Sequence, residues 1–400
     1  MKRHRYHPET ESVRGAANLD KRNAPMAQPI YQTSTFQVTD SDQQLRATST
    51  DMFYTRYGNP THTAVESAIA ELEGADAALL FASGMNAITT SILSLVKSGD
   101  HIVAQRDIYG GVTKFLSTWL PKFGVETTFV DTTDYDQHAR AIRPNTKFLY
   151  LESPTNPTLR IVDLRKPVEI ARKHQLITLI DSTFATPINQ RPAEFGVDVV
   201  LHSGTKFLGG HTDLICGVAA GRSDLIAKIR ETRTTLGGTM DPHAAFLLLR
   251  GIKTLALRIG HQNESALRVA EFLARHPKVR SVNYPFLEGH PQRAIAKEQM
   301  KGGGGVLSFE VDGTGEDAKR LSETLRLFTL APSLGGVESL VSIPVLTSHA
   351  MISAEQRQKM GVTEQLIRLS VGIENAGDLI ADIERALAAV APAPQHVAVG

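Results

Sequence analysis

The chain has 400 residues, of which 42% are hydrophobic and 21% are charged, and its formal net charge is +1. This composition is typical of a soluble globular protein, and the length predicts two domains, each with a core of its own. The near-neutral charge excludes a strongly basic nucleic-acid-binding protein, so we expect no nucleic-acid partner.

Nothing in the sequence predicts export, a membrane span or a metal site. Residues 1–5 are basic but are not followed by an apolar stretch, and no run is long enough to cross a bilayer. Cys216 is the only cysteine, which excludes an intramolecular disulfide and favours a reducing, cytoplasmic location. The 14 histidines are scattered without the spacing of known zinc motifs, so we expect no metal and no membrane partner.

The first 60 residues are polar and rich in turns, and we expect residues 1–60 to form an extended arm with little core. After the arm, short apolar runs alternate with helix-like stretches such as 62–73 and 167–173. The apolar runs lie at 77–82, 101–104, 126–130, 148–151, 176–180 and 197–201. This alternation predicts βαβ units and a mainly parallel sheet, which is an α/β fold, over residues 61–255.

The helix expected after the first apolar run begins with small residues, Ser83 and Gly84. Farther along, Ile88 and Ile92 fall on one helical face. A helix that starts in this way leaves backbone N–H groups open to an anion. The alternative, in which Ser83 merely caps the helix, remains open from this stretch alone.

The second half of the chain predicts a smaller α+β domain over residues 256–400. A long helical region, 243–275, leads into it, and Arg250-Gly251 predicts a break in that region. Strands and helices are then expected at 306–310, 316–325, 366–371 and 376–390, and the tail 391–400 is expected to be loose.

Polar side chains follow three of the predicted parallel strands. Glu152 opens a polar segment that reaches residue 157, Asp181 follows the run 176–180, and Lys206 comes shortly after the run 197–201. Ligands of open parallel sheets bind beyond the carboxyl ends of the strands, so we expect these groups to meet. Taken singly, each is as easily explained as a turn residue, a cap or a solvated charge.

The combination of these groups suits pyridoxal phosphate. A partly desolvated lysine, Lys206, can form a Schiff base with an aldehyde, and Asp181 can hold a pyridine nitrogen protonated. Hydroxyl groups and helix N-terminal amides can bind the phosphate. Nucleotide sites are less well supported, because residues 204–207 lack the Walker spacing and no GxGxxG motif follows an early strand.

Seven stretches of sequence carry a resemblance to a known family. They are YTRYGNPT (54–61), ASGM (82–85), ESPTNP (152–157), DSTFATP (181–187), SGTKFLGGH (203–211), LGGVESL (334–340) and LIRLSVGIE (366–374). In this order they resemble the Cys/Met-metabolism family of pyridoxal-phosphate enzymes, the trans-sulfuration enzymes. The resemblance implies the PLP-dependent transferase fold of type I, with a mainly parallel seven-stranded sheet between helices. It also implies amino-acid substrates and a homotetramer of dimers that share active sites.

The resemblance assigns roles to particular residues. It implies that Lys206 is the catalytic lysine that carries the cofactor, that Asp181 pairs with the pyridine nitrogen, and that Tyr109 stacks on the ring and takes part in catalysis. The residues implied to bind the phosphate are Gly84, Met85, Ser203 and Thr205, with Tyr54 and Arg56 contributed by the neighbouring subunit. The residues implied to bind the substrate are Asn156, Arg368, Ser339 and Glu338.

Within the family, the motifs favour a cystathionine γ-synthase. Methionine γ-lyases typically carry a cysteine where this chain has Gly111, and the run 327–340, which includes Glu338, is similar to the synthases. We therefore expect γ-replacement, in which an O-acylated homoserine such as O-succinylhomoserine and L-cysteine give L-cystathionine. The main alternative is cystathionine γ-lyase, which converts cystathionine to cysteine, 2-oxobutyrate and ammonia. Methionine γ-lyase, β-lyase, homoserine sulfhydrylase and a non-catalytic regulator of the same fold remain further alternatives.

Overall fold

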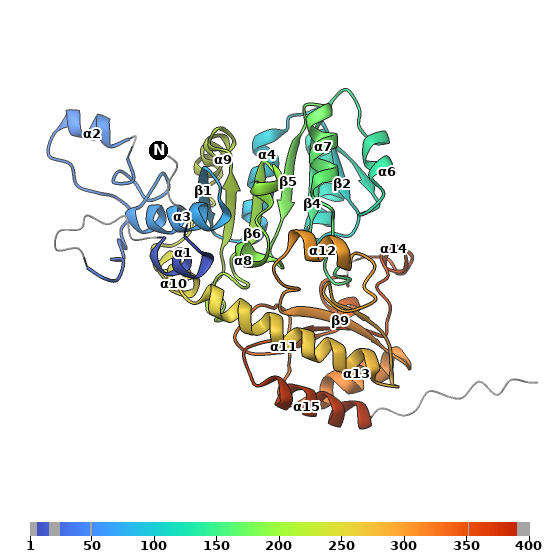
Figure 1. The fold of residues 1–400 in the computed structure, drawn as a ribbon. Helices are drawn as coiled ribbons and strands as arrows, with labels where there is room; N and C mark the ends of the chain where they lie inside the picture. The colour runs from blue at the N-terminus through green and yellow to red at the C-terminus, as the bar shows by residue number, and fades with distance from the viewer. Residues whose placement is uncertain (1–5, 16–24, 49, 351, 390–400) are drawn as a thin grey trace, which may run out of the picture.

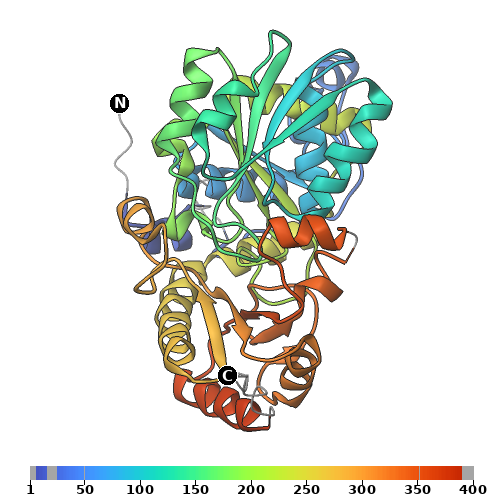
Figure 2. The same ribbon diagram turned by 90° about the vertical axis from the view of Figure 1, so that its right-hand side faces the viewer.

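The computed structural model describes residues 6–15, 25–48, 50–350 and 352–389. Two sheets, each flanked by helices, form the two parts of the structure (Figures 1 and 2). The long helix α11 (Leu255–Arg275) runs along the second part and contacts strands β8 and β9 there. The predicted pairing of a large α/β sheet with a smaller α+β unit is confirmed.

The larger sheet has seven strands in the order β1-β7-β6-β5-β4-β2-β3. Their bounds are β1 Ala77–Phe81, β2 His101–Gln105, β3 Glu126–Val130, β4 Thr146–Glu152, β5 Ile177–Asp181, β6 Val199–Ser203 and β7 Gly217–Gly221. Only β7 runs antiparallel to its neighbours, β1 and β6, within this sheet. The sequence did not reveal β7, because GVAAG has few of the branched or aromatic residues that mark strands.

Alternate residues of these strands pack against helices on opposite faces. Leu79 and Leu201 belong to one core with α4 (Gly84–Leu95) and α9 (Ser223–Leu236), whereas Leu80 and Val218 belong to another with α3 (Pro60–Glu73) and α10 (Pro242–Ile252). A parallel sheet that is buried on both faces leaves only its strand ends open to ligands.

The smaller sheet has the order β10-β11-β12-β9-β8, and β12 (Leu366–Ser370) is antiparallel to both of its neighbours. The other strands are β8 Val279–Asn283, β9 Val306–Val311, β10 Thr329–Leu330 and β11 Leu340–Ser342. Helices α11, α13 (Gly315–Thr324) and α15 (Ala376–Ala388) contribute to a core that also holds side chains of this sheet, including Phe309 and Ile367.

Two sequence expectations need correction. The helix break expected at Arg250-Gly251 falls at residues 253–254, because α10 continues through Ile252. A Cβ on Gly251 would lie 2.2 Å from the carbonyl oxygen of Gly209, so this glycine allows close packing and does not end the helix. The arm expected to be irregular contains two short helices, α1 (Pro8–Arg14) and α2 (Ser41–Ala47).

The remaining helices are short. They are α5 Gly110–Lys114, α6 Tyr135–Arg140, α7 Arg165–Lys173, α8 Thr186–Asn189, α12 Arg293–Gln299 and α14 Ala354–Lys359. Over the described ranges, no helix combines the length and the apolar character that crossing a membrane would require. The tail 391–400, which was expected to be loose, lies outside the described residues.

Two glycines give a matched test of this packing. A Cβ on Gly217 of β7 would lie 2.1 Å from the carbonyl oxygen of Ser83, whereas a Cβ on Gly260 of α11 would meet nothing within 4 Å. We expect Gly217→Ala to lower the free energy of unfolding by about 1–3 kcal/mol through overpacking. Gly260→Ala should raise it by about 0.5–1 kcal/mol, because glycine is costly inside a helix. Denaturant unfolding followed by circular dichroism measures both, and equal effects would contradict this account of β7.

Candidate active site

A cavity of about 660 Å³ lies at the carboxyl ends of β4, β5 and β6, where the two sheets meet. Strand ends from the large sheet and β12 of the small sheet both contribute to its lining. Among the residues predicted for the site, those that line the cavity are Gly84, Met85, Tyr109, Asn156, Asp181, Ser203, Thr205, Lys206 and Arg368. The structure therefore brings together the groups that sequence spacing placed at neighbouring strand ends.

The Lys206 amine lies at the junction of the two parts. Lys206 follows β6, and its Nζ atom donates a hydrogen bond of 2.7 Å to Ser333 Oγ. Burial, together with the positive charge of Arg368, lowers the pKa of Lys206 from 10.5 to about 8. A lysine with this pKa is neutral in about a tenth of molecules at pH 7, far more than an ordinary lysine, so it can act as a nucleophile or as a base.

Asp181 ends β5, and its carboxylate is buried in the same cavity. Asp181 Oδ1 accepts a hydrogen bond of 2.9 Å from the backbone N–H of Thr183. Burial raises the pKa of Asp181, because the charged form is poorly solvated there. No described residue forms an ion pair with Asp181, so a cationic ring nitrogen would find an unpaired carboxylate there.

The N-terminus of α4 opens onto the cavity. Ser83 Oγ accepts a hydrogen bond of 3.1 Å from the N–H of Asn86, so Ser83 does cap the helix. A Cβ on Gly84 would lie 2.7 Å from the Cβ of Ser203, so only glycine fits between α4 and β6. The Thr205 hydroxyl already bonds to the backbone of Cys216, whereas no described group pairs with the Ser203 hydroxyl. The glycine, the helix terminus and the Ser203 hydroxyl together suit an anionic group.

Arg368 lies on β12 and is buried. Its Nη1 atom donates to Asn156 Oδ1 at 3.0 Å, and Nη2 donates to the carbonyl oxygen of Ser333 at 2.9 Å. Both partners are neutral, and burial lowers the pKa of Arg368 from 12.5 to about 10. A guanidinium group held by neutral acceptors suits a carboxylate ligand.

Four predicted site residues do not line this cavity. Ser339 is buried but does not line the cavity, and its Oγ atom donates a hydrogen bond of 2.8 Å to Glu374 Oε2. Glu338 precedes it and is likewise outside the lining. Arg56 donates a hydrogen bond of 2.9 Å to the carbonyl oxygen of Thr234, and its guanidinium group lies over the rings of Tyr54 and Tyr57 in the arm. Contributions of these residues to a neighbouring subunit's site or to the substrate stay predictions.

Sequence reasoning gave Ser333 no place in the site, and it named Glu152 only as one of the polar groups at the strand ends, although both line the cavity. Both occur in stretches that carry the family resemblance or adjoin it, but serine and glutamate at such places have many ordinary explanations. Ser333 has φ of 94°, a left-handed conformation that is unusual for a residue other than glycine. That conformation can be recognised only in the structure.

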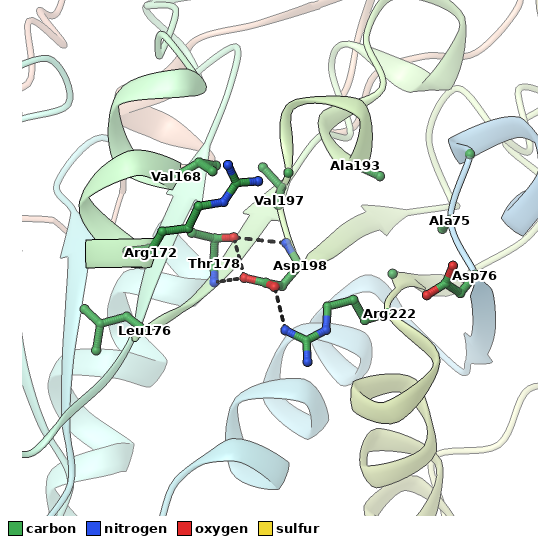
Figure 3. A pocket seen from close by; sticks show the side chains of 14 residues that line it. Ala75, Asp76, Val168, Arg172, Leu176, Thr178, Ala193, Val197, Asp198 and Arg222 are labelled. Atoms are coloured by element: carbon green, nitrogen blue, oxygen red, sulfur yellow. Dashed lines mark hydrogen bonds and ion pairs between the residues drawn. The ribbon is translucent and has the colours of Figure 1, made fainter. Parts of the chain in front are cut away.

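A second cavity, of about 420 Å³, lies at the opposite ends of the strands of the large sheet, and Figure 3 shows its lining residues. Its central carboxylate, Asp198, accepts from the Thr178 backbone and hydroxyl at 2.9 Å and pairs with Arg222 at 3.0 Å. These groups form hydrogen bonds and an ion pair with one another. Unlike the first cavity, this one is lined by no described lysine and by no described buried carboxylate that lacks a partner. Among the residues with described positions, no group of histidine, cysteine, aspartate and glutamate could hold a metal ion. The cavity with Lys206 is therefore the candidate active site.

The donor set of this cavity fits pyridoxal phosphate. A desolvated amine, an unpaired carboxylate and an open helix terminus match the aldehyde, the ring nitrogen and the phosphate. Tyr109 lines the same cavity at the start of α5, where its ring can lie against an aromatic cofactor. The fit rests on charged groups that no ion pair with a described residue neutralises.

Comparisons with known proteins agree with this fit. Residues 9–388 match the family model described as Cys/Met metabolism PLP-dependent enzyme. The chain is 42% identical over 380 residues to a cystathionine gamma-lyase of Bacillus subtilis, covering 95% of this chain and 98% of that one. It is 43% identical over 366 residues to the chloroplastic cystathionine gamma-synthase 1 of Nicotiana tabacum, covering 90% of this chain and 67% of that one.

A solved structure is similar over nearly the whole chain. It is a cystathionine gamma-lyase from Lactobacillus plantarum complexed with L-serine, with a TM-score of 0.91 and 40% identity, and it covers 96% of this chain and 99% of that one. Other relatives of comparable identity are named cystathionine beta-lyase and L-methionine gamma-lyase. Because these names differ, the overall likeness does not select one reaction.

The lowered pKa of Lys206 can be tested without cofactor. We expect the rate at which acetic anhydride labels Lys206 in the cofactor-free protein to rise with pH around a midpoint of about 8. Replacing Arg368 with leucine removes a positive charge that disfavours the protonated amine, so the midpoint should move to higher pH. Peptide mass spectrometry across a pH series measures both midpoints. A wild-type midpoint near 10.5, the ordinary lysine value, would contradict the burial of this amine.

Proposed function

The chain belongs to the Cys/Met metabolism family of PLP-dependent enzymes, and we propose that within this family it is a cystathionine γ-synthase. Its cofactor is pyridoxal phosphate, and its substrates are small amino acids. The proposed reaction joins an O-acylated homoserine, such as O-succinylhomoserine, to L-cysteine and releases the acyl group, with its ester oxygen, as a free carboxylate. The observation that carries amino-acid chemistry at this site is the placement of Lys206, Asp181 and Arg368 around one cavity.

The geometry at Gly111 supports the choice against a methionine γ-lyase. The family resemblance implies that those enzymes typically carry a cysteine at this position. A Cβ on Gly111 would lie 2.6 Å from Cε1 of the Tyr109 ring and 3.2 Å from Met85 Sδ. A cysteine here would therefore displace the tyrosine proposed to stack on the cofactor.

The choice between synthase and γ-lyase rests on sequence. The run 327–340 and Glu338 are similar to synthases, and the two activities share the groups that line the cavity. Cystathionine γ-lyase is therefore the second candidate, supported by the relative of that name in Bacillus subtilis. Methionine γ-lyase, β-lyase and homoserine sulfhydrylase activities are less favoured candidates.

Each residue of the cavity has a task in the proposed reaction. Arg368 and Asn156 hold the α-carboxylate of the homoserine derivative, which orients its Cα–H bond toward Lys206. Asp181 keeps the cofactor's ring nitrogen protonated, and Tyr109 holds the ring in place. When bound, pyridoxal phosphate supplies an electron sink for the electron pair left at Cα.

Lys206 moves the protons of γ-replacement. Its neutral amine would take the proton from Cα and pass it to the conjugated system that the bound cofactor supplies. Neutral again, it would take a proton from Cβ, so that the Cγ–O bond breaks and the acyloxy group leaves as a carboxylate. The cysteine thiolate then forms the new C–S bond at Cγ, and protons return to Cβ and Cα. The lowered pKa of about 8 lets one amine act both as base and as acid near neutral pH.

We also propose a cytoplasmic homotetramer of dimers with shared active sites. The arm exposes Tyr54 and Tyr57 at 40% and 42% of their surface, and Arg56 lies against their rings and does not line the cavity that holds Lys206. Such an arm suits contact with a second copy. The single cysteine, Cys216, is buried, which suits a reducing compartment.

Product analysis tests the proposed reaction. We expect the cofactor-loaded protein to form cystathionine from O-succinylhomoserine and L-cysteine, and to break cystathionine down only slowly. Mass spectrometry of both reactions measures the products, with Lys206→Ala as the inactive control. Release of cysteine and 2-oxobutyrate from cystathionine, without synthesis, would make the protein a γ-lyase. No turnover in either reaction would favour a non-catalytic regulator.

The role of Arg368 predicts a defect in substrate binding. Arg368→Lys keeps the charge but loses the planar fork that can bind a carboxylate with two parallel hydrogen bonds. We expect the KM for the homoserine derivative to rise about ten- to a hundredfold, as the loss of one charged hydrogen bond implies. Steady-state kinetics measures this, and Arg222→Lys in the opposite cavity is the matched control. An unchanged KM for Arg368→Lys would place carboxylate binding elsewhere.

A further inference from the structure

Glu152 is a buried carboxyl group with no role in the reaction proposed above. It ends β4, is 4% exposed and lines the cavity beside Asp181, its register partner on β5. Residues paired in a parallel ladder point to the same face, so these two carboxyl groups lie side by side at the strand ends.

Each oxygen of Glu152 accepts a backbone hydrogen bond. Oε2 accepts from the N–H of Tyr109 at 2.8 Å, and Oε1 accepts from the N–H of Asn156 at 3.0 Å. Tyr109 stands 43 positions earlier in the chain, at the start of α5, whereas Asn156 stands in the loop just after β4. One side chain thus fixes two backbone segments that approach the cavity from different sides.

The chain of contacts continues from Glu152 to the reactive amine. The Asn156 side chain accepts from Arg368 at 3.0 Å, Arg368 donates to the carbonyl oxygen of Ser333 at 2.9 Å, and Lys206 donates to Ser333 Oγ at 2.7 Å. The position of the Asn156 backbone therefore affects the position of Arg368, the arginine proposed to bind the carboxylate. The position of the Tyr109 backbone affects how its side chain would stack on the cofactor ring.

We infer that Glu152 is a positioning residue of the cofactor site, which sets Tyr109 and Asn156 at the same time through its two carboxyl oxygens. The inference rests on the cofactor and substrate roles proposed above for those two residues. It does not depend on which family reaction the enzyme performs. Burial and the charge of Asp181 raise the pKa of Glu152 well above its ordinary value, which shows that water has little access to this carboxyl group. Because water cannot replace the carboxyl group there, an N–H donor that lost its hydrogen bond to Glu152 would stay unsatisfied, at a cost in stability.

Glu152→Gln tests the inference, because glutamine has one acceptor oxygen and would turn an NH₂ group toward one of the two N–H donors. Asp198→Asn is the matched control. Asp198 also accepts a backbone N–H of the same sheet, that of Thr178 at 2.9 Å, but it does so at the opposite ends of the strands (Figure 3). A merely structural role predicts that both variants behave alike.

The readouts are the dissociation constant of pyridoxal phosphate, the circular dichroism of the bound cofactor and hydrogen exchange in the segment around Tyr109. We expect Glu152→Gln to weaken cofactor binding about tenfold or more, to reduce the cofactor's dichroism and to speed exchange at Tyr109. Asp198→Asn should leave all three unchanged, whatever it does to the unfolding midpoint. If the glutamine variant does not fold, Glu152→Asp carries the same test, since its shorter side chain can hold only one of the two N–H groups.

Two results would overturn the inference: wild-type affinity and dichroism in Glu152→Gln, or an equal loss in Asp198→Asn. Failure of the proposed function is recognised separately. The binding measurements include no turnover, so a γ-lyase product pattern leaves them intact. If Lys206→Ala still retained cofactor covalently after borohydride reduction, the cofactor site itself would be misplaced, and the inference about Glu152 would fall with it.

Discussion

The hydrogen bond from Lys206 Nζ to Ser333 Oγ joins the two sheets at the point where the chemistry is expected. Lys206 follows a strand of the large sheet, whereas Ser333 lies between β10 and β11 of the small one. Ser333 also accepts from Arg368, so one residue in an unusual backbone conformation receives hydrogen bonds from both cations. Lys206 is buried at this junction, and its burial lowers the pKa of the amine. Fold stability and reactivity are coupled at this contact.

The carboxyl edge of the large sheet could be predicted from sequence, because its signals are local. Apolar runs followed by polar residues indicated where β4, β5 and β6 end, and parallel order brings such ends to one edge. Asp181 and Lys206 were placed together on this ground, and the structure gives both the same cavity. Motif resemblance added Tyr109 and Arg368, which lie far from them in sequence and whose approach no periodicity reveals.

The features that sequence did not reveal depend on long-range contacts. The strand β7 has the weak sequence GVAAG, and its place between β1 and β6 is fixed by pairing on both sides rather than by its own residues. Gly251 predicted a helix break but is needed because Gly209 packs against it. In each case a distant neighbour, invisible in the local pattern, decides what the residue does.

Two charged groups in the cavity stand apart from other buried charges of the protein. Elsewhere, Glu11 pairs with Arg191 and Asp107 with Arg160, both at 2.6 Å. Asp181 has no cationic partner and Arg368 no anionic one among the described residues. A buried charge without a partner is costly.

Another buried cation, Arg258, also lacks a carboxylate partner among the described residues, but it bonds to the carbonyl oxygens of Phe207 and Gly251 and so braces the turn after Lys206. Arg368 also bonds to a backbone carbonyl oxygen, that of Ser333, and Asp181 accepts from the backbone N–H of Thr183, but both side chains line the cavity, which Arg258 does not. They are complementary to a ligand pair that brings a cation to Asp181 and a carboxylate to Arg368, with an aldehyde within reach of Lys206. A protein that served only as a structural element would gain nothing from holding these charges unpaired, so their presence favours a working catalytic site over a purely structural one.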